Sequence, residues 1–190
     1  MESIIIKGGK TLKGTINISG SKNASLPLLA SSILAGKLQL NNVPYLADIT
    51  SMLDLLSSLG LKYKYIDKKN KNSIFLDSTD KVSSIAEYNL VRKMRASFLV
   101  LGPLLTRTGF AKVSLPGGCA IGLRPVDLHV YAMKTLGAEI ELNDGYVIAK
   151  SKKGGLIGNK IKFPDISVGA TENAIMAAVL ARGETIIKNC

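Results

Sequence analysis

Residues 23–42 read NASLPLLASSILAGKLQLNN, which predicts a helix rich in Ala and Leu, a stop at Gly36 and then a short strand. Residues 173–189 read NAIMAAVLARGETIIKN and follow the same plan, with the stop at Gly183. Glycine is typical of a left-handed helix cap, because it has no Cβ to oppose a positive φ. The same structural unit is therefore predicted near both ends of the chain, and this decides the fold.

A third copy lies between these two. Residues 95–105 read RASFLVLGPLL and lead to Gly109, which is followed by a predicted strand over residues 110–115. The three glycines are separated by 73 residues (109 − 36) and 74 residues (183 − 109). A fixed period of this kind indicates an internal repeat.

Each period also contains a second helix and a β-hairpin. The predicted segments are helices over 48–60 and 127–137 and strands over 62–67, 139–142 and 146–149. Asn143-Asp144-Gly145 stands between the last two strands, and an Asp-Gly turn between alternating strands is a strong hairpin signal. A further short strand is expected over 15–18, ahead of the first helix.

The predicted fold class is therefore α/β, with helices alternating with short strands. The first helix of each unit is almost free of charge, so we expect it to be buried, with the second helix outside. Two units are complete, and the third stops at Cys190 after its first helix and strand. Three complete units would need roughly 40 more residues. We expect the chain to be a truncated piece of a longer protein.

Composition excludes several classes of function. The chain is 46% hydrophobic and 5% aromatic, and it lacks Trp, which argues against a nucleic-acid reader built on stacked rings. Two cysteines and one histidine give no metal-ligand pattern, so no metal and no cofactor are expected.

No apolar run is long enough to span a bilayer, and the N-terminus lacks signal-peptide features, so we expect a cytoplasmic protein without membrane insertion. The net charge of +11 favours anionic partners, although the basic run 62–71 is best interpreted as a solvated hairpin tip.

Polar residues stand at the start of all three inner helices. Lys22 and Asn23 follow a glycine-containing turn, Arg95 precedes the middle helix, and Ser167 precedes the last one. Helix N-termini attract anions, and a cation there adds a full charge. The alternative interpretation of each start alone is ordinary helix capping. By pseudo-symmetry the three starts converge at one end of the domain, which predicts a pocket for a multiply anionic ligand.

Residues 115–128 read LPGGCAIGLRPVDL and predict a glycine-rich loop with Cys119 at its centre. We expect nearby Arg124 to lower the pKa of the Cys119 thiol, which suits a nucleophile or a general acid. The alternative is a small residue that happens to be Cys. His129, in the helix after the loop, is interpreted as a partly buried helix residue, and Asp48, in the equivalent first-unit helix, as a helix cap.

Four motifs resemble one family along the whole chain: SGSKNA (19–24), KMRAS (93–97), PGGCAIGLRPVDLH (116–129) and SVGAT (167–171). They are similar to the UDP-N-acetylglucosamine 1-carboxyvinyltransferases, enolpyruvyl transferases of the EPSP synthase type. The resemblance implies an inside-out α/β barrel-type domain of repeated βαβαββ units with buried inner helices, truncated here in its third unit. Residues 1–21 would be an N-terminal strand and turn segment that packs with a second domain. Residues 22–190 would be an incomplete first domain, with the second domain absent.

The resemblance also implies an activity, the transfer of the enolpyruvyl group of phosphoenolpyruvate to the 3-hydroxyl of UDP-N-acetylglucosamine, the first committed step of bacterial peptidoglycan synthesis. Lys22 and Asn23 would bind phosphoenolpyruvate. Cys119 would donate the proton, form a covalent adduct with phosphoenolpyruvate and react with fosfomycin-type inhibitors, and Arg124 would bridge both substrates. The residues implied to hold the UDP-sugar are Arg95, Arg124, Pro125, Val126, Asp127, Leu128, Ser167, Val168 and Gly169. Because a catalytic carboxylate and further arginines come from the second domain in this family, the chain alone should bind weakly and turn over poorly.

Two rival functions stay open at this point. The related enzyme acting on shikimate 3-phosphate shares the fold, but its corresponding loop is serine-rich and lacks the Cys. A non-catalytic module that binds anions or RNA is suggested by the +11 charge, and it would show steeply salt-dependent binding. It is disfavoured by the few aromatic residues.

Overall fold

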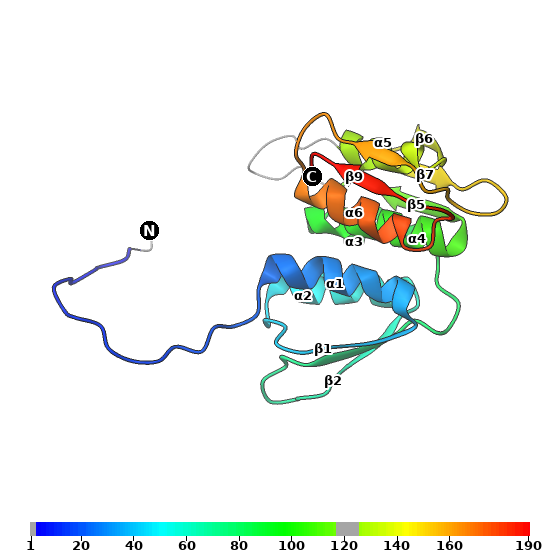
Figure 1. The fold of residues 1–190 in the computed structure, drawn as a ribbon. Helices are drawn as coiled ribbons and strands as arrows, with labels where there is room; N and C mark the ends of the chain where they lie inside the picture. The colour runs from blue at the N-terminus through cyan, green and yellow to red at the C-terminus, as the bar shows by residue number, and fades with distance from the viewer. Residues whose placement is uncertain (1–2, 117–125) are drawn as a thin grey trace.

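The structure is a computed structural model that describes residues 3–116 and 126–190. It has the predicted α/β character, with helices layered against three small sheets of strand order β1-β3-β2, β4-β5-β7-β6 and β8-β9 (Figure 1). Within the described ranges the sheets form no closed barrel.

The first unit is a three-stranded antiparallel sheet with two helices on one face (Figure 1). Its elements are α1 (Lys22–Ala35), β1 (Lys37–Leu40), α2 (Ala47–Ser58), β2 (Lys62–Tyr65) and β3 (Ile74–Asp77). Ile74 and Leu76 of the central strand are at most 1% exposed, and they join the core formed with the helices. The burial of these alternate residues fixes the register of the sheet, because a shift by one residue would turn both side chains to the solvent.

The second unit repeats this plan and adds a strand at its start. Its elements are β4 (Ile85–Ala86), α3 (Tyr88–Val91), η1 (Arg95–Val100), α4 (Leu101–Thr108), β5 (Phe110–Ser114), α5 (Asp127–Thr135), β6 (Glu139–Asn143) and β7 (Tyr146–Lys150). β4 and β5 are parallel, which makes the helices between them a crossover connection. β6 and β7 form the predicted hairpin, and Asp144 and Gly145 at its tip have φ of 49° and 77°, as a type I′ turn requires.

The third unit contains β8 (Lys160–Lys162), α6 (Val168–Ala178) and β9 (Ile186–Lys188). β8 and β9 are parallel and are connected through α6, so this unit reproduces the crossover of the second. The predicted repeat is confirmed in the order and type of these elements.

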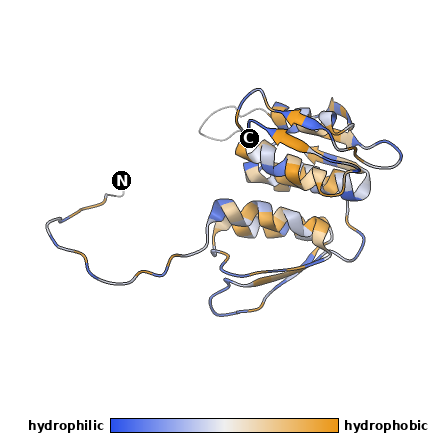
Figure 2. Cartoon of the chain, in the orientation of Figure 1, coloured by the Kyte–Doolittle hydropathy of each residue, from blue (hydrophilic) through white to orange (hydrophobic). Residues whose placement is uncertain are grey.

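The inner helices α1, α4 and α6 pack against one another, and they carry mostly apolar and neutral residues (Figure 2). Only the middle one is enclosed on both sides, and its Leu101, Leu104 and Leu105 are fully buried. By contrast, α1 leaves Leu28 49% exposed and α6 leaves Ile175 51% exposed. The expectation of buried inner helices therefore holds fully for α4 and in part for the outer two.

One arginine of the second unit bonds to groups of the first unit. Arg107, in the last turn of α4, donates to the carbonyl oxygens of Ile33 and Ser78. It also bonds the Ser78 hydroxyl at 2.8 Å. Because the last carbonyls of a helix have no partner within the helix, Arg107 supplies one for α1 from the neighbouring unit.

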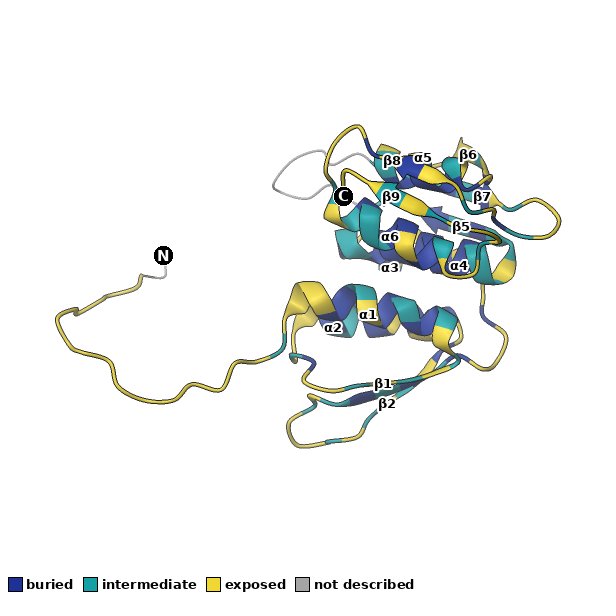
Figure 3. Cartoon of the chain, viewed as in Figure 1, coloured by how far each residue is buried: buried dark blue, intermediate teal, exposed yellow. Residues whose placement is uncertain are grey.

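Three details of the prediction are wrong. Residues 3–21 contain no helix or strand, and residues 3–19 are exposed (Figure 3). The strand expected over 15–18 does not form, because no described segment pairs with its backbone groups. The middle inner helix begins as the 3₁₀ helix η1, and Gly183 lies beyond the end of α6 instead of capping it, although its φ is positive at 87°.

Candidate functional site

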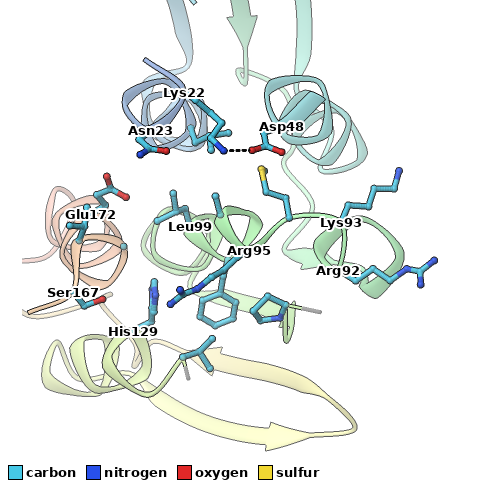
Figure 4. Close-up of a pocket in the computed structure, with 18 residues that line it drawn as sticks. Lys22, Asn23, Asp48, Arg92, Lys93, Arg95, Leu99, His129, Ser167 and Glu172 are labelled. Carbon is cyan, nitrogen blue, oxygen red and sulfur yellow. Dashed lines mark ion pairs between the residues drawn. The ribbon is translucent and has the colours of Figure 1, made fainter. Parts of the chain in front are cut away.

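The starts of α1, η1 and α6 meet at one pocket of ≈ 610 Å³, as the repeat predicts (Figure 4). The lining residues are Lys22, Asn23, Leu26, Asp48, Arg92, Lys93, Met94, Arg95, Ala96, Phe98, Leu99, Pro116, Val126, His129, Ser167, Val168, Gly169 and Glu172. Four of these side chains are cationic and two are carboxylates, so the described lining favours an anionic ligand.

The start of α1 is built by its N-cap, Ser21. The Ser21 hydroxyl accepts from the backbone N–H of Ala24 at 3.3 Å, which satisfies one of the N–H groups left free at a helix start. Gly20 passes so close to the next segment that a Cβ there would lie 1.6 Å from the carbonyl oxygen of Asn42. A larger residue at position 20 would displace the chain that leads into this cap.

Lys22 forms an ion pair with Asp48 of α2, with Nζ 2.7 Å from Oδ2 (Figure 4). The two side chains are 47% and 38% exposed. The interpretation of Asp48 as a helix cap is therefore wrong: the N-cap of α2 is Leu46, and Asp48 lies in the first turn, where its carboxylate holds the Lys22 ammonium at the edge of the pocket. No local pattern indicated this pair, because the two helices meet only in the tertiary structure.

The start of α6 repeats the geometry of α1 without its lysine. The Ser167 hydroxyl accepts from the N–H of Ala170 at 3.4 Å, and the Thr171 hydroxyl donates to the Ser167 carbonyl at 2.8 Å. Ser25 donates to the Ser21 carbonyl in the same way at 2.8 Å. In α6 the first helical residues, Val168 and Gly169, line the pocket, and the first N–H groups of a helix have no carbonyl partner within it.

Arg95 is the first residue of η1 and is half-buried. Figure 4 shows its side chain reaching toward His129, on the side of the pocket where α6 begins. Arg92 and Lys93, from the segment before η1, add two further cations to the lining. Neither was predicted as a site residue, although Lys93 is the first residue of the KMRAS motif and Arg92 directly precedes it.

His129 lies in the pocket wall and is 5% exposed, so it is more buried than expected. Burial, assisted by the positive charge of Arg95, lowers the pKa of His129 to about 4. Its Nδ1 atom lies 3.0 Å from the amide nitrogen of Asn173, a buried residue that the sequence analysis did not select. Nearby Glu172 has a pKa raised by burial.

Several predicted site residues fall elsewhere. Cys119, Arg124 and Pro125 lie outside the described residues. Val126 lines the pocket, whereas Asp127 and Leu128, in the first turn of α5, are not among the lining residues.

Residues 3–116 and 126–190 contain neither a candidate membrane span nor a candidate metal site. No helix there is long and apolar enough to cross a membrane. No three His, Cys, Asp or Glu side chains there are grouped so that they could hold a metal ion.

Comparison with protein families gives a match over residues 6–190 to the model described as EPSP synthase (3-phosphoshikimate 1-carboxyvinyltransferase). Among curated proteins, the UDP-N-acetylglucosamine 1-carboxyvinyltransferases of Rickettsia prowazekii (strain Madrid E) and Rickettsia africae (strain ESF-5) are each 55% identical over 190 residues. That of Rickettsia felis (strain ATCC VR-1525 / URRWXCal2) is 54% identical. Each alignment covers 100% of this chain and 45% of the relative, so the chain spans less than half the length of these proteins.

Solved structures match the fold. The enolpyruvyl transferase NikO from Streptomyces tendae superposes with a TM-score of 0.73 at 19% identity, and EPSP synthase from Acinetobacter baumannii with 0.68 at 18% identity. Each covers 95% of this chain, while the chain covers 41% of each structure. At these identities the likeness supports the fold and says nothing about the substrate.

Proposed function

The chain belongs to the EPSP synthase family, and from that membership we propose that it is part of a UDP-N-acetylglucosamine 1-carboxyvinyltransferase. The observation that carries the proposal is the 55% identity to such enzymes along all 190 residues. The reaction would transfer the enolpyruvyl group of phosphoenolpyruvate to the 3-hydroxyl of the UDP-sugar and release phosphate. The reaction would be the first committed step of peptidoglycan synthesis in the bacterial cytoplasm. Cell shape and cell division would depend on it.

The chemistry assigns a role to each side of the pocket. Lys22 and Asn23 would hold phosphoenolpyruvate, and Cys119 would protonate its methylene carbon, which makes the neighbouring carbon electrophilic. The sugar hydroxyl then adds to that carbon and loses its proton. Loss of a methyl proton and of phosphate restores the double bond. Fixed cations such as Lys22 and Arg124 would stabilise the departing phosphate.

The UDP-sugar would occupy the other side of the pocket. Arg95 and the run from Arg124 to Leu128 would bind it, with Ser167, Val168 and Gly169 beside its diphosphate. The free N–H groups and the caps at the start of α6 support this assignment, because a diphosphate is the kind of ligand that such a helix start favours.

We extend the proposal to the architecture of the longer protein. The three units would belong to a barrel-type domain with its helices inside, residues 22–190 would form most of that domain, and residues 1–21 would pack with a second domain. The second domain would supply a catalytic carboxylate and further arginines. The 190-residue chain alone is therefore expected to bind its substrates weakly and to turn over poorly.

Labelling with fosfomycin tests the proposal. We expect mass spectrometry to find one adduct, on Cys119. The matched variants are Cys119→Ala, which should lose the adduct, and Cys190→Ala, which removes the exposed terminal thiol and should keep it. An adduct on Cys190 alone, or none, would contradict the site.

Titration separates the rival functions. A UDP-N-acetylglucosamine enzyme should bind that nucleotide sugar and ignore shikimate 3-phosphate, and the shikimate enzyme should do the reverse. An RNA-binding module should bind RNA with a steep dependence on salt and should ignore both small molecules.

A further inference from the structure

One asparagine connects three elements behind the pocket. Asn173 of α6 is fully buried. Its Oδ1 accepts from the backbone N–H of Gly102 in α4 at 2.6 Å, and its Nδ2 donates to the Phe98 carbonyl in η1 at 3.1 Å. The same Nδ2 lies 3.0 Å from Nδ1 of His129 in α5.

These contacts determine where the imidazole carries its hydrogen. A backbone N–H can only donate and a carbonyl can only accept, so Oδ1 must face Gly102 and Nδ2 must face Phe98. The second hydrogen on Nδ2 then points to His129, and Nδ1 must accept it without a hydrogen of its own. A neutral imidazole carries one hydrogen, so it lies on Nε2.

The donor atom faces the first turn of α6. A Cβ on Gly169 would lie 3.5 Å from Cε1 and 3.7 Å from Nε2 of His129, so this edge of the ring borders the turn capped by Ser167. Phe98 packs edge-on against the ring, with the centroids 5.2 Å apart, and holds it in place. Among the described residues, none accepts a hydrogen bond from Nε2, although His129 is only 5% exposed.

We propose that Asn173 is a positioning residue, which fixes His129 as a neutral donor whose Nε2–H bonds an anionic oxygen of the bound substrate. The inference rests on the proposed function for the identity of that substrate, and the oxygen belongs to a phosphate of the UDP-sugar or to phosphoenolpyruvate. A proton on Nδ1 would point at Nδ2 of Asn173, a donor facing a donor, so the arrangement opposes an imidazolium. The positive charge in this part of the pocket then comes from Arg95, and His129 contributes a neutral hydrogen-bond donor with a fixed orientation.

The first test needs no ligand. The chain has a single histidine, so ¹⁵N NMR of the ring reports on His129 alone. We expect the Nε2–H tautomer at pH 7 and no titration down to pH 5. In Asn173→Asp the carboxylate accepts from Nδ1–H, so the ring should switch tautomer or become protonated. An Nδ1–H tautomer in the unmodified chain, or a midpoint near 6.5, would overturn the role of Asn173.

The second test measures binding by calorimetry. His129→Phe keeps a planar aromatic ring at this position and removes the donor, so affinity should fall about 10-fold. His129→Gln can place an amide N–H near the Nε2 position and should stay within about 3-fold of the unmodified chain. UDP and phosphoenolpyruvate are titrated separately, and the ligand that loses affinity identifies the oxygen. Asn159→Ala, which lies outside the pocket lining, is the control and should bind both anions as tightly as the unmodified chain does.

The outcomes separate the two proposals. Equal affinities of His129→Phe and the unmodified chain for both UDP-N-acetylglucosamine and phosphoenolpyruvate would overturn the donor role and leave the proposed function intact. Because the chain alone is expected to bind weakly, the titrations extend to millimolar ligand. If the unmodified chain binds neither UDP-N-acetylglucosamine nor phosphoenolpyruvate there, both the proposed function and the donor role fail. The tautomer then still decides whether Asn173 positions the ring.

Discussion

The helices α1 and α6 begin with the same serine cap and differ in what lies behind it. Behind the first turn of α1 is the ion pair of Lys22 and Asp48, whose side chains are 47% and 38% exposed. Behind the first turn of α6 is a buried network of neutral groups around Asn173 and His129. An exposed pair contributes little to stability and can change partner when a ligand arrives. A buried network is expensive to break, so it keeps its geometry.

The largest effect is expected when the buried network loses its centre. Asn173→Ala leaves the Gly102 N–H and the His129 Nδ1 without this partner and opens a small cavity, so the free energy of unfolding should fall by about 4 kcal/mol. Urea unfolding followed by circular dichroism measures it. Asn159→Ala is the matched control, because Asn159 bonds the Thr135 carbonyl at an exposed position, and it should cost less than about 1 kcal/mol. If Asn173→Ala and Asn159→Ala lowered the free energy of unfolding equally, the buried network would be no more important for stability than an exposed hydrogen bond.

Acid should weaken the same network. The pKa of His129 is about 4 in the folded chain and about 6.5 when unfolded, so between these values only the unfolded state binds the proton. Stability therefore falls as the pH drops from 6.5 and the loss is complete below about 4, where it approaches about 3 kcal/mol. Unfolding by urea at a series of pH values should show this loss in the unmodified chain.

His129→Gln supplies the reference for that series. It retains the other titrating groups, including Glu172, whose raised pKa acts in the opposite direction by favouring the folded state as it takes up a proton. The difference between the two chains isolates His129. Parallel stability curves for both chains would show that the pKa of His129 is the same in the folded and unfolded states, which contradicts the lowered pKa.

A smaller effect is expected from crowding the network. A Cβ on Gly102 would lie 2.4 Å from Oδ1 and 2.5 Å from the backbone oxygen of Asn173, so Gly102→Ala must move α4 away from α6. We expect a loss of about 2 kcal/mol, measured as a lower urea midpoint. Gly137→Ala is an unsuitable control because its φ is positive, whereas Gly169→Ala fits at ordinary contact distances and should be near neutral for stability. A harmless Gly102→Ala would mean that the two helices are less tightly packed than described.

The smallest effect on stability is expected at the start of α1. Asp48→Asn removes the partner of Lys22, but both groups are well exposed, so stability should change by less than about 0.5 kcal/mol. Because the Lys22 ammonium is then released, phosphoenolpyruvate should bind at least as tightly as before in calorimetry. A loss of several kcal/mol would show that this pair is as structural as the network at α6.

The same contrast explains which features of the structure could be predicted from the sequence. The repeat, the hairpin at Asp144-Gly145 and the helix starts at Lys22, Arg95 and Ser167 follow from local patterns, and the structure contains them. The partner of Lys22 lies 26 residues away (48 − 22), and Asn173 reaches residues 71, 75 and 44 positions distant. Such pairs arise from packing, which a periodic pattern does not encode. The strand over 15–18 was overpredicted for a related reason, because a strand needs a partner and local sequence does not supply one.

Arg107 has a consequence for the time at which the chain folds during synthesis. It closes the end of α1 from a position 74 residues after Ile33. At roughly 5–20 residues per second, the ribosome makes this arginine about 4–15 seconds after the carbonyl that it binds. For that interval the nascent first unit has an unfinished helix end and no neighbour over the apolar side of α1. The final contact of the first unit is thus made only when the second unit has emerged, which orders the folding of the two units along the direction of translation.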